Sequence, residues 1–334
     1  MTAERLLRVA VIGATGAVGS EVLRLLEARR FPLQEMLPIA TNDSVGESVE
    51  MLGSEIPVIT DRNHLHGLDC ALLCTPRDQA LPWVRAALEA EVPCIDLSGA
   101  SAVTPEVPLL VADSPPDPVA LGQPVVACPG GSALAWARVL QPLHAAVTLR
   151  RLVATSFESV SAVGRRGIDA LKAETIALFN QQEPPESDAF DHGVAFDCLP
   201  RAGARGEQGQ TRNEEVLVRE LQRVLGVPVP AVVTSVQTPI FAGCGASLVI
   251  DTEQSISSAE AIDLLAKTAG VAVWDEAAPG PSTRDAVDED DVLVGRIRRD
   301  PSSEAGLALW LVADPIRLAA VNALRLAEAR FARG

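Results

Sequence analysis

The sequence predicts an α/β protein: a doubly wound, Rossmann-type parallel sheet domain followed by an α+β domain. Strand and helix patterns alternate up to about residue 148, a glycine-rich turn follows the first strand pattern, and longer β-rich runs come later. The chain has 334 residues, 48% of them hydrophobic, which is enough to bury the cores of two domains. We expect the first domain to comprise residues 1–132 and 316–334, and the second 133–315.

The first predicted element is the apolar run Leu7–Ile12, which suits a buried parallel strand. Gly13, Gly16 and Gly19 follow in the pattern GxxGxxG, and helical periodicity begins at Val22. In dinucleotide-binding folds such glycines permit the tight turn, and the helix N-terminus receives the pyrophosphate. The order of strand, turn and helix predicts a cofactor-type site; a tight turn without a ligand is the alternative.

Five further segments have strand patterns: EMLPIAT, CALLCTP, VPCIDLSG, PLLVAD and PVVAC. The segment DQALPWVRAALEAE is typical of an amphipathic helix, and a long apolar helix is expected from Ser132. Ligands of doubly wound sheets bind outside the carboxyl ends of the strands. The hydroxyl residues that follow the strands are therefore positional candidates: Thr41, Thr75, Ser98 and Ser132.

The second domain is expected to contain a mixed sheet with helices. Its β-rich runs are LRRLVATSFESVSAVGRRG, VPAVVTSVQTPIF and GASLVIDTE, and RNEEVLVRELQRVLG has a helical pattern between them. The final segment DPIRLAAVNALRLAEARFA predicts an amphipathic helix that returns to the first domain.

Charge and cysteine spacing exclude several classes of function. The formal net charge of −16 disfavours nucleic acid and anionic membranes as partners. The N-terminus has no signal-peptide pattern and no apolar run reaches about 18 residues, so we expect a soluble, cytoplasmic protein. Four histidines and six scattered cysteines show no zinc-ligand spacing, so no metal is expected. The cysteines are Cys70, Cys74, Cys94, Cys128, Cys198 and Cys244.

Over nearly its full length the chain resembles the aspartate-semialdehyde dehydrogenases. The matching pieces include VAVIGATGAVGSEVLRLL, IDLSGAS, ACPGGSALAWARVLQPL, VSAVGRRGIDAL, TPIFAG and STRDAVDEDDVLVGRIRRD. The resemblance implies a glyceraldehyde-3-phosphate-dehydrogenase-like fold, a homodimer, and NADP-dependent reductive dephosphorylation of an acyl phosphate in amino-acid biosynthesis. In that chemistry a cysteine thiolate forms a thioacyl enzyme, the nicotinamide exchanges hydride with it, and a histidine transfers the proton.

Carried over residue by residue, the resemblance places the family's nucleophile on Gly131, which has no side chain to form a thioester. Cys128 occupies the family's asparagine position, three residues earlier, and Cys244 occupies the histidine position. Glu158 takes the place of the catalytic-loop glutamine. Ser132 is expected to cap the helix rather than to act as a nucleophile, because the sequence shows no histidine base beside it.

Three substrate-binding positions implied by the resemblance are also changed. Gln237 stands at the arginine that grips the substrate carboxylate, and it cannot supply a bidentate cationic fork. The phosphate-binding arginine falls near Ala102, and the substrate-contacting lysine near Val216.

The cofactor-binding candidates lie in the glycine turn and in the segment TNDSVGES. Asp43 and Glu47 stand where the family has the arginine and lysine that hold the 2′-phosphate of NADP. Asp43 suits a ribose 2′-hydroxyl better, so NADP, NAD or no dinucleotide all stay open. The candidate contacts are Gly13, Thr15, Gly16, Ala17, Val18, Thr41, Asp43 and Ser44.

These observations predict a divergent, catalytically degenerate relative that keeps a nucleotide-binding fold and a dimer interface. Its partner would be a second copy, an active paralogue, or a small-molecule or nucleotide ligand. The alternative is an active NAD(P)-dependent oxidoreductase on an aldehyde or acyl phosphate, using Cys128 or Cys244 as its thiol.

Overall fold

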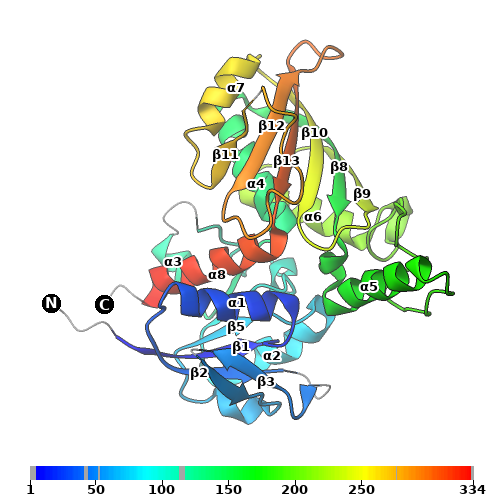
Figure 1. Cartoon of the computed structure of the whole chain (residues 1–334). Coiled ribbons are helices and arrows are strands. Elements are labelled where there is room, and N and C mark those ends of the chain that lie inside the picture. Colours follow the sequence, from blue (N-terminus) through cyan, green and yellow to red (C-terminus); the bar gives the residue numbers. More distant parts are fainter. Residues whose placement is uncertain (1–4, 41–43, 52, 113–116, 276, 332–334) are drawn as a thin grey trace. The chain divides into compact units, whose positions relative to one another are not determined.

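The computed structural model describes residues 5–40, 44–51, 53–112, 117–275 and 277–331. The chain divides into two compact units (Figure 1). Unit 1 comprises residues 1–130 and 319–334, and unit 2 comprises residues 131–318.

Unit 1 is built on a five-stranded parallel sheet in the order β2-β1-β5-β6-β7. The strands are β1 (Leu7–Ile12), β2 (Leu33–Ile39), β5 (Cys70–Leu73), β6 (Cys94–Asp96) and β7 (Val125–Ala127). β2 lies on one side of β1 and β5 on the other, so the strand order reverses next to β1. In open α/β sheets this reversal opens a crevice at the carboxyl ends of the strands, and ligands bind there.

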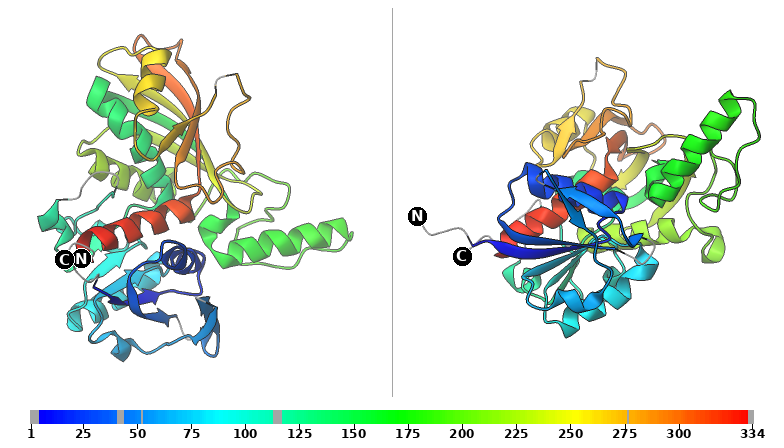
Figure 2. Two further views of the ribbon diagram at one scale, coloured as in Figure 1. Left: turned by 60° about the vertical axis from the view of Figure 1, so that its left-hand side comes forward. Right: turned by 60° about the horizontal axis from the view of Figure 1, so that its bottom comes forward.

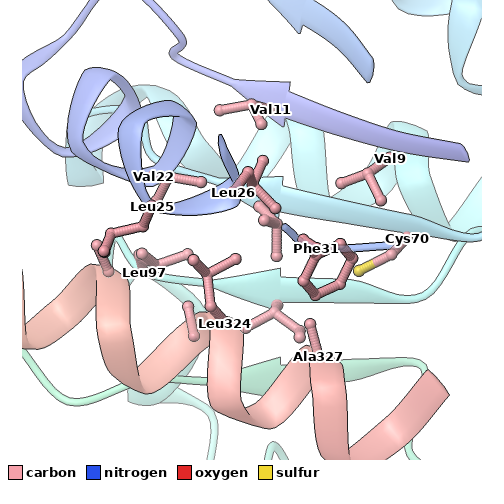
Figure 3. Packing of buried hydrophobic residues seen from close by; sticks show 14 of the residues in the cluster. Val9, Val11, Val22, Leu25, Leu26, Phe31, Cys70, Leu97, Leu324 and Ala327 are labelled. Atoms are coloured by element: carbon pink, nitrogen blue, oxygen red, sulfur yellow. The ribbon is translucent and has the colours of Figure 1, made fainter. Parts of the chain in front are cut away.

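Helices cover both faces of this sheet (Figure 2). Along β1 the side chains alternate, and Val9 and Val11 face α1 (Ala17–Ala28) and the part of α8 (Pro315–Phe331) that belongs to unit 1. Figure 3 shows how Leu25, Leu324 and their neighbours fill this layer. The intervening β1 residues face α2 (Arg77–Glu89), whose Trp83 and Val84 are buried in the second layer. The doubly wound α/β prediction is confirmed.

In its described residues, unit 1 also contains the hairpin β3–β4, helix α3 and the 3₁₀ turns η2 and η3. Their bounds are Ser48–Met51 for β3, Ser54–Pro57 for β4, Pro118–Leu121 for α3, Arg62–Leu65 for η2 and Ser101–Val103 for η3.

The strand expected in PLLVAD is wrong. Within residues 108–112, the described part of this segment, Leu109 forms an isolated bridge to Ala127. Two backbone hydrogen bonds join these residues to β7, which is too few for a continuous strand.

Unit 2 is built on a six-stranded mixed sheet in the order β11-β12-β13-β10-β8-β9. The strands are β8 (Leu149–Glu158), β9 (Ala231–Gln237), β10 (Cys244–Thr252), β11 (Val271–Val273), β12 (Val292–Arg299) and β13 (Gly306–Ala313). β8 pairs with β9 in parallel and with β10 antiparallel, so the carboxyl end of β8 lies beside the start of β10. This register brings the end of one long β run next to the start of another, and it sets the position of the site.

In the described residues, four helices and two 3₁₀ turns complete unit 2. Helix α4 (Gly131–Val147) is buried on nearly all sides between residues 133 and 140 and packs against α6 (Arg212–Leu225) and α7 (Ser258–Leu265). α6 begins with a capping box, and α5 (Arg165–Phe179) extends outward, away from the strands of this unit (Figures 1 and 2). The remaining 3₁₀ turns are η4 (Val160–Val163) and η5 (Glu207–Gly209). The mixed α+β prediction is confirmed.

Candidate functional site

The glycine turn after β1 is held by close backbone packing. Gly13 has φ +89°, and a Cβ on it would lie 2.8 Å from the carbonyl carbon of Cys74, in the loop after β5. A Cβ on Gly19 would lie 2.1 Å from the Gly13 oxygen. At Gly16 the nearest atom, the same oxygen, is 3.3 Å away. Gly13 and Gly19 are therefore required by the turn, whereas a Cβ on Gly16 would make one tight contact that a shift of a few tenths of an ångström could relieve.

The N-terminus of α1 has no side-chain cap. Gly16 is the N-cap residue, and Ala17 and Val18, both half-buried, begin the helix. Uncapped N–H groups at a helix start bind anions such as phosphate. The hydroxyls of Thr15 and Ser44 lie 3.1 Å apart and join the loops that follow β1 and β2. Five of the predicted cofactor contacts thus gather at this end of the sheet, with Ser44 beside them.

Thr75 adds an unsatisfied polar atom to this end of unit 1. The residue is buried, and its hydroxyl has no hydrogen-bond partner in the described part of the chain. Its backbone nitrogen is 2.9 Å from where a Cβ on Gly13 would be. Buried hydroxyls are almost always paired, so an orphaned one beside a glycine cradle is what a ligand-binding crevice would leave.

A hollow of about 550 Å³ lies beside Ala40, directly after β2. The Arg62 guanidinium lies 5.0 Å from the ring centroid of Trp83 and covers this ring. The remaining lining residues are Thr60, Asp61, Gln79 and Pro82. Sequence reasoning missed this hollow, although the polar run after IPVIT and the inward-facing tryptophan of α2 were visible signals. Its place at the end of β2 suits the adenosine half of a dinucleotide.

Two of the predicted cofactor residues, Thr41 and Asp43, lie outside the described residues, and their roles stay predictions. Glu47, at the family's lysine position, is exposed.

At the start of α4, Gly131 has no room for a side chain. A Cβ on this residue would lie 2.0 Å from the carbonyl oxygen of Pro315 and 2.4 Å from its carbonyl carbon. These are backbone atoms at the start of α8, so they cannot turn away as a flexible side chain would. The position that the resemblance assigns to the nucleophile is therefore filled by the protein's own main chain.

Three predicted site residues meet next to this glycine, all within unit 2. The Ser132 hydroxyl donates to Oε2 of Glu158 at 3.4 Å and lies 4.0 Å from the Cys244 sulfur. Ser132 comes from the first turn of α4, Glu158 from the end of β8 and Cys244 from the start of β10. The expectation that Ser132 caps α4 is wrong, because the helix already begins at Gly131 and the hydroxyl points to Glu158.

Burial controls the protonation of this cluster. Desolvation raises the pKa of Glu158 above its ordinary 4.5, and the hydroxyls of Ser156 and Ser132 offset part of that rise. Desolvation also raises the pKa of the Cys244 thiol, and the neighbouring carboxyl of Glu158 adds to the effect. A reactive cysteine needs a lowered pKa, because the thiolate is the nucleophile. This environment therefore disfavours the Cys244 thiolate.

Gln237 has a positioning role that sequence reasoning missed. Its side-chain amide donates to the backbone oxygen of Glu158 at 2.9 Å, and the Thr238 hydroxyl donates to the same oxygen at 2.8 Å. Because Gln237 pairs with Glu158 in the β8–β9 register, these bonds fix the end of β8. The amide thus holds the strand that carries Glu158.

Cys128 belongs to the core of unit 1. It is fully buried in the same apolar layer as Val126 and Leu97, and its backbone N–H donates to the Asp96 carbonyl at 2.8 Å. The predicted thiols Cys128 and Cys244 thus lie in different units. Attack by Cys128 on a substrate would require this core to open.

The loop after β6 is ordered by one carboxylate. Asp96, fully buried, accepts the backbone N–H groups of Ser98 and Ser101, each at 2.8 Å, and also both of their hydroxyls. The Ser98 hydroxyl is therefore part of the turn. Ala102, at the family's phosphate-arginine position, is buried, and Val216 is half-buried on α6.

In the part of the chain that the structure describes, no three histidine, cysteine or acidic side chains are grouped to hold a metal ion. Among the described helices, none has the length and apolar content needed to cross a membrane.

Both units match known families. Residues 8–120 match the NAD-binding domain of semialdehyde dehydrogenases, and residues 140–318 match the dimerisation domain of the same enzymes.

Similar proteins cover nearly the whole chain. A relative named aspartate-semialdehyde dehydrogenase, from Aquifex aeolicus, is 34% identical over 331 residues, which is 96% of this chain and 97% of the relative. The crystal structure of aspartate semialdehyde dehydrogenase II from Vibrio cholerae superposes with a TM-score of 0.90 at 31% identity, covering 97% of this chain and 98% of that one. A second structure of that enzyme, complexed with ASA, gives a TM-score of 0.89 at 32% identity with the same coverage.

Proposed function

Because the chain belongs to the aspartate-semialdehyde dehydrogenase family, we propose that it keeps the family's two domains but does not carry out the thioester step. The observation that carries this proposal is the packing at Gly131. A thioacyl intermediate needs a thiol at the start of α4, and the Pro315 backbone fills the space where that thiol's Cβ would lie.

An active oxidoreductase that uses another thiol has less support. Cys128 is fully buried in a core, and the pKa of Cys244 is raised rather than lowered. Neither environment favours a thiolate, which this alternative requires.

Dinucleotide binding is the second part of the proposal. The uncapped α1 N-terminus, the glycine cradle and the orphaned Thr75 hydroxyl fit a pyrophosphate, and the hollow beside Ala40 fits an adenosine. A bound nicotinamide dinucleotide would supply hydride exchange. We propose NAD over NADP, because the sequence places Asp43 and Glu47 where a 2′-phosphate needs cations.

A homodimer is the third part. On α5 and the segment after it, Phe179 and Phe196 form an edge-to-face pair with ring centroids 5.7 Å apart, and both rings are largely exposed. Ile176 and Leu178 add exposed apolar surface on the same helix. This exposed apolar patch lies on the unit that matches the family's dimerisation domain, so it favours a second copy of the chain as its partner. Light scattering on Phe179→Asp would test it, with a shift to the monomer mass as the expected result.

The deciding experiment measures turnover of aspartate semialdehyde with inorganic phosphate, followed by reduction of the cofactor. Aspartate semialdehyde is the compound that appears in the names of the relatives. The protein is used at high concentration, and NAD and NADP are offered separately. We expect no reduction of either cofactor. We also expect NAD to quench the tryptophan fluorescence saturably, because Trp83 lines the hollow beside Ala40. Trp83→Phe is the control for that signal. Reduction that disappears in Cys128→Ser or Cys244→Ser would overturn the proposal and identify the thiol.

A further inference from the structure

The hydroxyl of Ser132 is the nucleophilic group that the start of α4 still offers. Unlike the fully buried Cys128, Ser132 is only partly buried, and unlike Cys244 it needs no prior ionisation to serve in a base-assisted attack. It lies within hydrogen-bond distance of a carboxylate, at 3.4 Å. Contacts between nucleophile and base are often this long in ligand-free proteins and shorten when substrate binds.

We propose that Ser132 accepts an acyl group from an uncharged ester, with Glu158 as its general base. This inference goes beyond the proposed function, which concerns hydride transfer through a thioester. It requires no cofactor and no thiol.

The step balances without a further reagent. The Ser132 oxygen forms a bond to the ester carbonyl carbon while its proton moves to Glu158. The bond from that carbon to the leaving oxygen then breaks, and Glu158 returns the proton to the departing alcohol. In the second half, water gives its proton to Glu158 while its oxygen bonds to the acyl carbon. The bond from that carbon to the Ser132 oxygen then breaks, and Glu158 returns the proton to this oxygen, which releases a carboxylic acid and restores the free hydroxyl.

Glu158 is held in place for this role from several sides. Gln237 and Thr238 fix its backbone oxygen, and Ser156 contacts its carboxyl from the same strand. The titratable groups coupled to the cluster are Cys244 on β10, which faces Ser132 and Glu158, and Asp314 after β13, which acts on Cys244. Burial raises the pKa of Glu158, which strengthens it as a base compared with an exposed glutamate.

The charges of the cluster define the class of acyl donor. Its side chains are a hydroxyl, a carboxyl, a thiol and an amide, and no cationic group is among those bonded or electrostatically coupled to it in the described residues. Within the cluster itself, a phosphate or carboxylate on the substrate would meet the Glu158 carboxylate and no cationic side chain. An uncharged ester avoids this repulsion, so it is favoured over an acyl phosphate.

The test uses the full-length protein and p-nitrophenyl acetate, with acetyl phosphate as the charged comparison. We expect release of p-nitrophenolate and one added acetyl group by intact mass, which peptide mapping assigns to Ser132. Glu158→Gln should slow acylation by about 100-fold, the usual contribution of a general base. Acetyl phosphate should label Ser132 more slowly than the ester.

Further variants distinguish a chemical role of Ser132 and Glu158 from a merely structural one. In the wild type the acylation rate should rise with pH as Glu158 loses its proton, with a midpoint above the ordinary glutamate value, and Glu158→Gln should abolish this dependence. Ser132→Cys should keep the acetyl group at position 132, now as a thioester. Cys198→Ser removes the exposed thiol as a background acceptor. An unchanged rate in Ser132→Ala, or acetyl found only elsewhere, would overturn the inference and leave the proposed function untouched.

Discussion

Two turns from a parallel strand into a helix, one after β1 and one after β7, depend on glycine for different reasons. After β1, Gly19 is required by the Gly13 oxygen of the same turn, and the helix start has no side-chain cap. After β7, Gly131 is required by Pro315, a residue far along the chain. The first turn is a local motif that leaves room for an anion. The second is filled by the protein itself, so similar strand–turn–helix patterns can have opposite consequences for binding.

The largest effect is expected at the second turn. Gly131→Cys should destabilise the protein by about 3 kcal/mol, because the new Cβ overlaps backbone that cannot rotate away. Urea unfolding measures the loss, and the same sample should show no aspartate-semialdehyde oxidation. A stable, active Gly131→Cys would show that the start of α8 yields easily and would remove the contrast between the turns.

At the first turn, Gly19→Ala should lower the free energy of unfolding by about 2–3 kcal/mol, because its Cβ would overlap the Gly13 oxygen. Gly16→Ala is the matched control, three residues away. Its stability should stay within about 1 kcal/mol of wild type, because its Cβ would meet one backbone oxygen at 3.3 Å, a tight contact that a small shift can relieve. Thermal and urea unfolding of the two variants should therefore differ clearly. Equal losses would contradict the local explanation of the turn.

The buried carboxylates of the two units extend the comparison. Asp96 accepts four hydrogen bonds that order its loop. Asp96→Asn should lower the free energy of unfolding by about 2 kcal/mol, because the donors of these bonds lose a charged acceptor. The measurement is the urea midpoint at neutral pH, with Asp61→Asn, on an exposed turn, as the control.

Substitution of Glu158 should have the smallest effect on the stability of the folded protein, and it should raise that stability rather than lower it. Burial raises its folded-state pKa above 4.5, so the folded protein holds this proton more tightly than the unfolded chain. The stability contributed by the protonated form is complete below 4.5 and is lost as pH rises through the raised pKa. Glu158→Gln should therefore melt at a higher temperature than wild type at neutral pH, and this advantage should vanish below 4.5. An advantage that persists in acid would point to packing instead.

The parts of the fold that are local in sequence could be predicted. The strand Leu7–Ile12, its glycine turn and helix α1 follow from neighbouring residues, and so does α6 with its capping box. The contact between Gly131 and Pro315 could not be predicted, because periodicity carries no information on which distant backbone fills a gap.

The candidate site was predictable residue by residue but not as a cluster. Ser132, Glu158 and Cys244 were each singled out, yet only the antiparallel pairing of β8 with β10 brings the last two together. The role of Gln237 depends on the β8–β9 register, and the orphaned hydroxyl of Thr75 depends on how the loop after β5 packs. Both are consequences of strand pairing and packing.

The Pro315 backbone at Gly131 also limits the substitutions that this lineage can accept. A cysteine at position 131 would give the folded chain an overlap with the Pro315 backbone before it could add any catalysis. Recovery of the thioester step would need the start of α8 to shift first, and that shift alone brings no catalytic gain. If the chain lacks the thioester step, as we propose, the benefit of a cysteine at position 131 would therefore depend on a second change at the start of α8.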